Sequence, residues 1–172
     1  MALEDKGVLV VSGDATMVLI EGYPETRSKT YDFAGVPAPE ISFSASHPNI
    51  SWDSQTNEIV IAPGLEQGIY AAALTAVNGF APDADLIIQL TVKGPPTISG
   101  DTDLTLLQGY LEARTDAYTF TGLPEPEIGF SASDPRITWD TQTNEIVIAP
   151  GLGQGNYTAT FTAANGYNPD AE

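Results

Sequence analysis

Pairs of acidic residues at alternate positions are the side chains of this sequence best suited to chemistry. Asp83 and Asp85 form one pair and Asp101 and Asp103 another, each in a stretch with the composition of a loop. Carboxylates spaced in this way supply the oxygen ligands that calcium prefers. They are equally typical of solvated side chains that accept hydrogen bonds from turn backbone. No acidic loop has the spacing of a complete calcium cage, so both interpretations stay open, and the sequence predicts no other cofactor.

Residues for acid-base or nucleophilic catalysis are scarce. The only histidine is His47, and the chain has no cysteine. The chain repeats internally, as described below, and Asp134 stands at the repeat position of His47. A Ser-His-Asp triad could therefore form in one copy at most. We predict that the protein is not an enzyme.

The charge balance restricts the class of partner. The chain has 23 Asp and Glu residues against 6 Lys and Arg residues, a formal net charge of −17. Nucleic acids and anionic membranes bind cationic surfaces, so neither is an expected partner. No run of about 20 apolar residues could cross a bilayer. Residues 1–6 lack the apolar segment of a signal peptide, which is expected of an intracellular protein or of a sequence whose export signal lies elsewhere in a parent protein.

One stretch of the chain occurs twice. Residues 52–68 return as residues 139–155, where only Ser54 and Glu66 are exchanged, for Thr141 and Gly153. Trp52 recurs as Trp139, an offset of 87 residues that also aligns residues 13–14 with 100–101 and residues 31–37 with 118–124. An ungapped repeat of this length predicts two copies of one domain. We place the domains at residues 1–93 and 94–172.

The pattern of apolar residues predicts strands throughout. Short β-branched and aromatic runs, separated by Gly, Pro, Asn and Asp, predict strands in the first copy at residues 8–11, 16–20, 30–33, 41–44, 50–52, 58–62, 68–78 and 86–92. No helical period is found. The fold class is therefore all-β, with two tandem antiparallel β-sandwich domains. Residues 93–96, which include two prolines, predict a stiff linker between them.

Comparison of the copies separates the two faces of the longest strand, residues 68–78. Alternate positions stay apolar in both copies and are predicted to face the core: Tyr70, Ala72, Leu74 and Ala76, with Tyr157, Ala159, Phe161 and Ala163. The positions between them become polar in the second copy and are predicted to face solvent.

Four further aromatic residues have two interpretations each. Trp52 and Trp139 lie in register with inward-facing isoleucines, and we predict that both belong to the core rather than to a ligand platform. Phe80 and Tyr167 follow the longest strand in Asn-Gly-aromatic loops. An exposed aromatic there would contact a ligand, and a buried one would close the end of the sandwich.

Several motifs resemble known Ig-like domains. Gly68-x-Tyr70-x-Ala72 and its copy Gly155-x-Tyr157-x-Ala159 resemble the strand F signature of immunoglobulin domains, with alanine in place of cysteine. The wider pattern is similar to the cadherin-like Ig domains of bacterial cell-surface proteins, which occur in tandem: Ile50-Ser51-Trp52-Asp53, Thr56-Asn57-Glu58-Ile59, Gln67-Gly68-x-Tyr70 and Ala76-Val77-Asn78-Gly79. Asn57 and Asn144 stand where that family prefers glycine. The resemblance implies an Ig-like fold, an extracellular or cell-surface setting, and a structural hydrogen bond from Tyr70 and Tyr157 to upstream backbone.

The second copy has no counterpart of residues 86–92, because Glu172 aligns with Asp85. We predict a second domain that lacks its last strand and exposes a strand-edge groove, open to strand exchange or dimer formation. Adding such a strand after Glu172 is expected to raise the thermal midpoint.

Three functions fit the sequence. The first is a non-catalytic tandem Ig-like module of a bacterial cell-surface or secreted protein, an adhesin stalk or presentation domain. The second is a direct binder of a host protein, such as an immunoglobulin, or of a glycan. The third is an accessory domain of a glycan-degrading enzyme.

Overall fold

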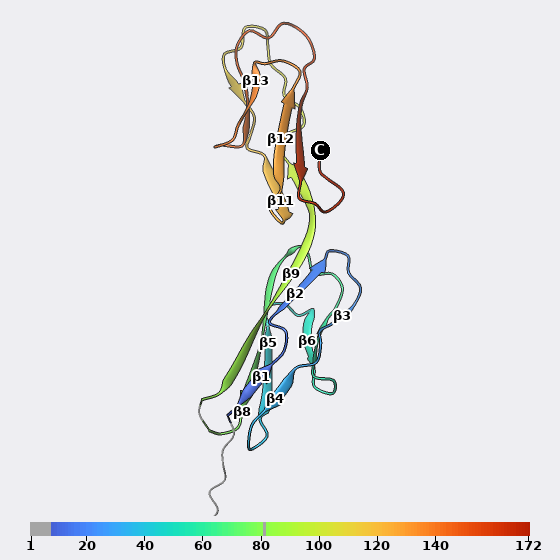
Figure 1. Ribbon diagram of the computed structural model, residues 1–172. Coiled ribbons are helices and arrows are strands. Elements are labelled where there is room, and N and C mark those ends of the chain that lie inside the picture. Colours follow the sequence, from blue (N-terminus) through green and yellow to red (C-terminus); the bar gives the residue numbers. More distant parts are fainter. Residues whose placement is uncertain (1–7, 81) are drawn as a thin grey trace, which may run out of the picture. The chain divides into compact units, whose positions relative to one another are not determined.

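The computed structural model describes residues 8–80 and 82–172, and the features predicted for residues 1–6 lie outside this part of the chain. All regular structure in the described residues is β-strand (Figure 1). They contain no helix, and hence none that could cross a membrane. The chain divides into two compact units, residues 1–93 and 94–172, each with its own apolar core. The predicted all-β class is confirmed.

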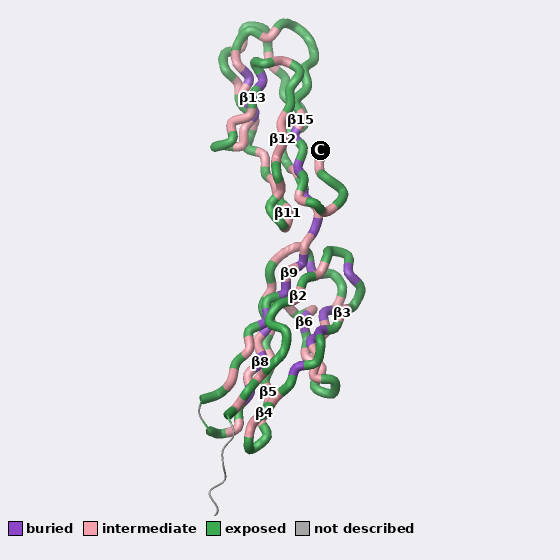
Figure 2. Tube along the Cα trace, viewed as in Figure 1, coloured by how far each residue is buried: buried purple, intermediate pink, exposed green. Residues whose placement is uncertain are grey.

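The first unit is a sandwich of one large sheet against two small ones. The large sheet has the strand order β2 (Thr16–Ile20), β9 (Ala84–Ser99), β8 (Gly68–Val77) and β5 (Glu40–Ala45). Opposite it lie the sheet β3 (Thr26–Arg27), β7 (Glu58–Ile61) and β6 (Ile50–Asp53) and the pair β1 (Val10–Ser12) and β4 (Asp32–Ala34). Buried and exposed residues alternate along the strands (Figure 2), as the period of two requires.

One strand pair departs from the predicted antiparallel pattern. β2 runs parallel to β9, with Thr16 beside Gln89 and Ile20 beside Lys93. The reason is that the chain passes from one sheet to the other between β1 and β2 and does not form a hairpin there. β1 pairs with β4, and after a bend at residues 13–15 the chain continues as β2 in the large sheet. β2 therefore keeps the direction of β1 and joins the free edge of β9.

The core of the first unit is closed. Its fully buried side chains come from both layers of the sandwich, with exposures of 0–2%: Tyr31, Ile59, Ile61, Leu65, Leu74, Ile88 and Val92. Tyr31 fixes the bend at residues 13–15, because its Oη donates to Asp14 O at 2.9 Å and its N–H donates to Asn57 O at 2.8 Å. Burial of the ring raises the pKa of Tyr31, and the nearby Asp14 charge adds to this shift.

The turn between β6 and β7 explains why asparagine can replace glycine. Asn57 has φ 55° and Asn144, at the same position of the second unit, has φ 58°. This left-handed conformation favours glycine, and asparagine is among the few other residues that adopt it readily. The departure from the family pattern therefore leaves the turn unchanged.

The second unit repeats most of this plan. Its strands are the end of β9 with β11 (Thr119–Leu123), the sheet β10 (Ala113–Arg114), β14 (Glu145–Ile148) and β13 (Ile137–Asp140), and the pair β12 (Glu127–Ala132) and β15 (Ala159–Ala164). The buried core is smaller and consists of Ile137, Ile146, Ile148 and Phe161, with Ala163 also buried.

The predicted linker residues 93–96 join the two units, and they lie within strand β9. The first part of β9 pairs with β8 and β2, and the second part pairs with β11, from Gly94 to Ser99. Pro95 and Pro96 are accommodated where the register of the second pair shifts, between Thr121 and Leu123. A proline has no N–H to donate to the neighbouring strand. At an irregularity of this kind the neighbouring strand does not need that hydrogen bond.

Candidate functional site

Within residues 94–172, the second unit repeats only part of the strand pairing of the first unit. In the first unit, residues 84–92 of β9 pair with β8 on one side, and residues 89–93 pair with β2 on the other. Residues 94–172 contain no counterpart of residues 86–92. Two further segments lack strand structure although their counterparts are strands: residues 103–107, which correspond to β2, and residues 155–158, which correspond to the start of β8.

The pairing map explains which segments lose their strand structure. β2 pairs only with β9, and residues 68–71 of β8 likewise have β9 as their only ladder partner. Residues 72–77 of β8 also pair with β5. Their counterpart β15 keeps the equivalent pairing with β12, from Ala159 to Ala164. The segments without strand structure are therefore those whose counterparts in the first unit have β9 as their only ladder partner.

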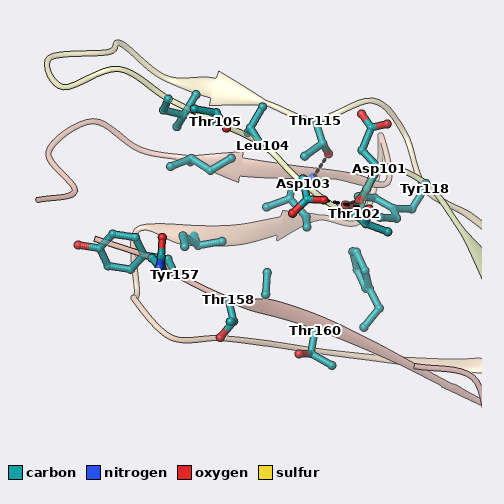
Figure 3. Close-up of a pocket in the computed structure, with 18 of the residues that line it drawn as sticks. Asp101, Thr102, Asp103, Leu104, Thr105, Thr115, Tyr118, Tyr157, Thr158 and Thr160 are labelled. Carbon is teal, nitrogen blue, oxygen red and sulfur yellow. Dashed lines mark hydrogen bonds between the residues drawn. The ribbon is translucent and has the colours of Figure 1, made fainter. Parts of the chain in front are cut away.

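A groove of about 740 Å³ occupies this place. Figure 3 shows Leu104 and Thr105 on one side of it and Tyr157, Thr158 and Thr160 on the other. Its floor is apolar and includes Ile137, Ile146, Ile148 and Phe161, four side chains of the core of the second unit.

Comparison with the first unit shows that residues beside this core are more exposed, although the four core side chains themselves are 5–8% exposed. Ala72 is 5% exposed, whereas its counterpart Ala159 is exposed. Tyr157 is 37% exposed and Leu104 is 48% exposed. The prediction that Tyr157 and Ala159 are core residues is therefore wrong. Ile88 and Leu90 lie beside the equivalent positions Ala72 and Tyr70 in the first unit, and residues 94–172 have no such neighbours.

Two tyrosines of the groove keep their structural hydrogen bonds. Tyr157 Oη donates to Gly153 O at 3.3 Å, as Tyr70 Oη does to Glu66 O at 3.0 Å, which is the upstream backbone contact that the resemblance implies. Tyr118 Oη donates to Asp101 O at 2.5 Å at the end of the groove. Burial raises the pKa of Tyr118, and the Asp101 charge raises it further.

The predicted calcium ligands belong to different units. In the first unit, Asp83 directly precedes β9 and Asp85 is the second residue of β9, whereas Asp101 and Asp103 line the groove of the second unit. Within residues 8–80 and 82–172, no three His, Cys, Asp or Glu side chains are close enough to hold a metal ion together. Calcium binding stays a prediction.

The tryptophans lie in aromatic clusters. Trp52 packs near Tyr31, Phe33 and Phe43, with ring centroids 5.9–6.2 Å apart. In the second unit, Trp139 lies 5.5 Å from Phe161 and close to Phe120 and Phe130, which also pack against the core. Both indoles are only half-buried.

The two loop aromatics differ in exposure. Phe80 is 42% exposed, and Tyr167 is half-buried. Their backbone N–H groups donate to Asn78 Oδ1 at 3.2 Å and to Asn165 Oδ1 at 3.1 Å, so the Asn-Gly turns have the same local structure. Their predicted role as ligand contacts is untested.

The three-stranded sheet of each unit, β3-β7-β6 and β10-β14-β13, carries the same cluster of charged side chains. Arg27 Nη1 lies 3.0 Å from both Asp53 Oδ2 and Glu58 Oε2, and Arg114 forms the same cluster with Asp140 and Glu145. The hydrogen bond from Arg27 lowers the pKa of Asp53. Since each arginine joins both strands of a hairpin, we assign these clusters to the fold rather than to binding.

An exposed aliphatic surface on the first unit is a feature that the sequence analysis missed. Val18 and Ile20 of β2, Ile87 of β9 and Ile69 of β8 are 58–70% exposed. They come from three adjacent strands and alternate with inward residues, so they lie on the outer face of the large sheet. Thr105, Leu107 and Asn156 stand at the positions of Val18, Ile20 and Ile69 in the second unit. The sequence feature that could have revealed this surface is the continuous apolar run at residues 86–88. In a strand with alternating faces, its middle residue Ile87 must face solvent.

None of the protein-family models or curated proteins compared with this chain matches it. Among solved structures, it is similar to the complex described as Dpr11 IG1 bound to DIP-gamma IG+IG2, at 15% identity and TM-score 0.63, with 95% of this chain and 94% of that chain covered. It is also similar to Dpr2 Ig1-Ig2 in complex with DIP-Theta Ig1-Ig3, at 17% identity and TM-score 0.62, covering 92% and 61%.

A third similar structure, Sidekick-1 immunoglobulin domains 1-4, has 12% identity and TM-score 0.52, with 96% of this chain and 47% of that chain covered. This chain therefore spans less than two thirds of the length of two of the three structures. At such identities the likeness concerns the fold alone. The two units are Ig-like β-sandwich domains.

Proposed function

We propose that this chain is a non-catalytic tandem Ig-like module of a bacterial cell-surface or secreted protein, where it spaces or presents a binding region. One observation carries the proposal: the contacts that recur in both units are those of the scaffold. Three sets of side-chain contacts have partners at equivalent positions in both units: the hydrogen bonds of Tyr31 and Tyr118, the hydrogen bonds of Tyr70 and Tyr157, and the two arginine clusters. A repeat preserved for its fold supports a spacing role. The bacterial and extracellular setting rests on the motif resemblance.

The described residues also support the non-catalytic part of the proposal. His47 Nδ1 accepts a hydrogen bond from the Asn49 N–H at 3.1 Å, and its ring packs edge-on against Tyr70 at 5.7 Å. Both contacts stabilise the turn before β6. A histidine engaged in this way is held by its own backbone rather than aligned with a nucleophile.

A direct role in protein binding is the second candidate, and the aliphatic surface favours it. Large apolar side chains that gather on one sheet face are typical of protein contacts. Two of the similar structures are described as Ig domains bound to other Ig-domain proteins. Immunoglobulin, itself built of Ig domains, is therefore the first partner to test, followed by mucin as a glycan source.

One experiment separates the two candidates. The full chain is immobilised, and binding of purified immunoglobulin and of mucin is measured by surface plasmon resonance. A spacer binds neither, whereas a direct binder gives saturable binding that the double variant Ile69→Lys, Ile87→Lys abolishes. Ser42→Lys, on exposed Ser42 of β5 in the same sheet, is the control and should leave such binding unchanged. Saturable binding that follows this pattern would refute the spacing role.

A further inference from the structure

The sheet face that carries the aliphatic surface of the first unit has no charge at its centre. Its central outward residues, from β2, β9, β8 and β5, are aliphatic, small or hydroxyl-bearing, with Gln89 as the one amide. Charges stand only toward the ends of these strands, with Lys93 at one end and Asp85 and Glu40 at the other. Because burial of an unpaired charge is costly, a face of this kind can be removed from water by a partner.

The size of the face fits a weak but specific contact. Asp85 and Lys93 are eight residues apart in β9, a span of about 26 Å at about 3.3 Å per residue. Four strands at a spacing of about 4.8 Å make the face about 19 Å wide. Two such faces bury roughly 1,000 Å² in total, which is near the lower limit of a specific interface.

The charges on this face are self-complementary. Gln89 lies midway between Asp85 and Lys93 in β9. A two-fold axis that lies between two such sheets and crosses β9 at right angles near Gln89 makes the strands of the two copies antiparallel. Lys93 of each copy then lies opposite Asp85 of the other, so that opposite charges meet at both ends. An axis parallel to the strands would instead bring like charges together.

Large and small side chains also match in the antiparallel arrangement. Ile69 lies beside Thr91, two positions to one side of Gln89, and Ala73 lies beside Ile87, two positions to the other side. The two-fold axis exchanges these two rows. Ile69 therefore packs on Ala73 of the other copy, and Ile87 packs on Thr91 of the other copy. Side chains of facing, aligned sheets interdigitate in this way.

We propose that the aliphatic surface binds a second copy of this chain, in an antiparallel dimer formed by two first units. Closed two-fold dimers are the commonest oligomers, and they require a surface that matches itself. The reciprocal pairing of Lys93 with Asp85 selects this occupant. The proposal goes beyond the spacing and binding roles described above and requires neither, since it concerns the chain alone.

The test is sedimentation velocity of residues 1–172 from ~1 μM to ~1 mM. Since the net charge of −17 on each copy opposes association, we expect a weak, reversible shift from the 18.2 kDa monomer to the dimer within this range. The double variant Ile69→Lys, Ile87→Lys should weaken the dimer at least ~10-fold. The control Ser51→Lys, Gln55→Lys adds the same charge to exposed residues of the other layer and should change the dimer constant by no more than about twofold.

Charge exchange tests the arrangement of the two copies. Lys93→Asp and Asp85→Lys should each weaken the dimer, because like charges then meet at both ends, and the two changes combined should restore it. Asp85→Lys makes the chain less negative, so its weakening effect cannot come from the net charge. The thermal midpoint shows that each variant is folded. The proposal is overturned if the chain stays monomeric at ~1 mM, if the lysine control weakens the dimer as much as the double variant, if neither single charge change weakens it, or if the combined change fails to restore it.

Discussion

A methyl group added at Gly13 would strike the best-buried ring of the protein. A Cβ at Gly13 would lie 2.2 Å from Cδ1 and 2.6 Å from Cε1 of Tyr31, well inside van der Waals contact. The Tyr31 ring is 0% exposed and its hydroxyl is bound to Asp14 O. It therefore has no free space to move into, and Gly13→Ala must displace the ring, the bend at residues 13–15, or both.

The cost can be worked from these contacts. Overpacking of a closed core costs about 1–3 kcal/mol, and loss of the Tyr31 hydrogen bond costs about 0.5–1.5 kcal/mol. The sum is roughly 1.5–4.5 kcal/mol. Since 1 kcal/mol moves the midpoint of a domain of this size by roughly 4–8 °C, the first unit should melt at least about 6 °C lower.

The second unit supplies a matched comparison. A Cβ at Gly100 would lie 2.3 Å from Cδ1 of Tyr118, but Tyr118 is only half-buried and lines the open groove. The ring can swing toward the groove, so Gly100→Ala should lower the midpoint of its unit by less than half as much. Differential scanning calorimetry of the full chain, with the exposed Ser12→Ala as control, measures both shifts. A Gly13→Ala shift no larger than that of Ser12→Ala, or equal shifts in the two units, would refute the reasoning.

Substitutions at three further positions test the repeated contacts. Asn57→Val should lower the midpoint of the first unit and Asn57→Gly should not, because only valine is strained at φ 55°. Tyr70→Phe should destabilise that unit by about 1 kcal/mol in urea unfolding, because Glu66 O loses its hydrogen bond. Arg27 holds the pKa of Asp53 below its ordinary value, so its contribution to stability is present above the pKa of an unfolded aspartate and is lost as the pH falls through the lowered folded value. Arg27→Gln should therefore flatten the fall in midpoint on acidification, and an unchanged pH profile would contradict this assignment.

Local pattern was sufficient to locate most strands. Strands and their faces in the first unit were located from the alternation at residues 16–20 and 58–62 and from the comparison of residues 68–78 with their copy. Both signals arise because burial on one face imposes a period of two. The two-residue strands β3 and β10 were missed, since Thr26–Arg27 and Ala113–Arg114 are too short to show a period. The parallel pairing of β2 with β9 was also missed, because partners distant in the chain leave no local signal.

Only part of the candidate site could be predicted from the sequence. The repeat alignment showed that residues 94–172 hold no copy of residues 86–92, since Glu172 aligns with Asp85. It did not reveal that residues 103–107 and 155–158 lose their regular structure as well, nor that Tyr157 and Ala159 are exposed. That consequence follows from which segments share a ladder partner. The aliphatic surface was missed for the same reason, because Val18 and Ile87 become neighbours only through the order of the strands.

Amide hydrogen exchange of residues 1–172 tests the central claim most directly. The two units share one plan, but the pairing of residues 16–20 and 68–71 with β9 has no counterpart within residues 94–172. This difference predicts strong protection at residues 16–20 and 68–71 and exchange close to the unprotected rate at residues 103–107 and 155–158, with β15 protected. Equal protection of the corresponding segments in the two units would contradict it.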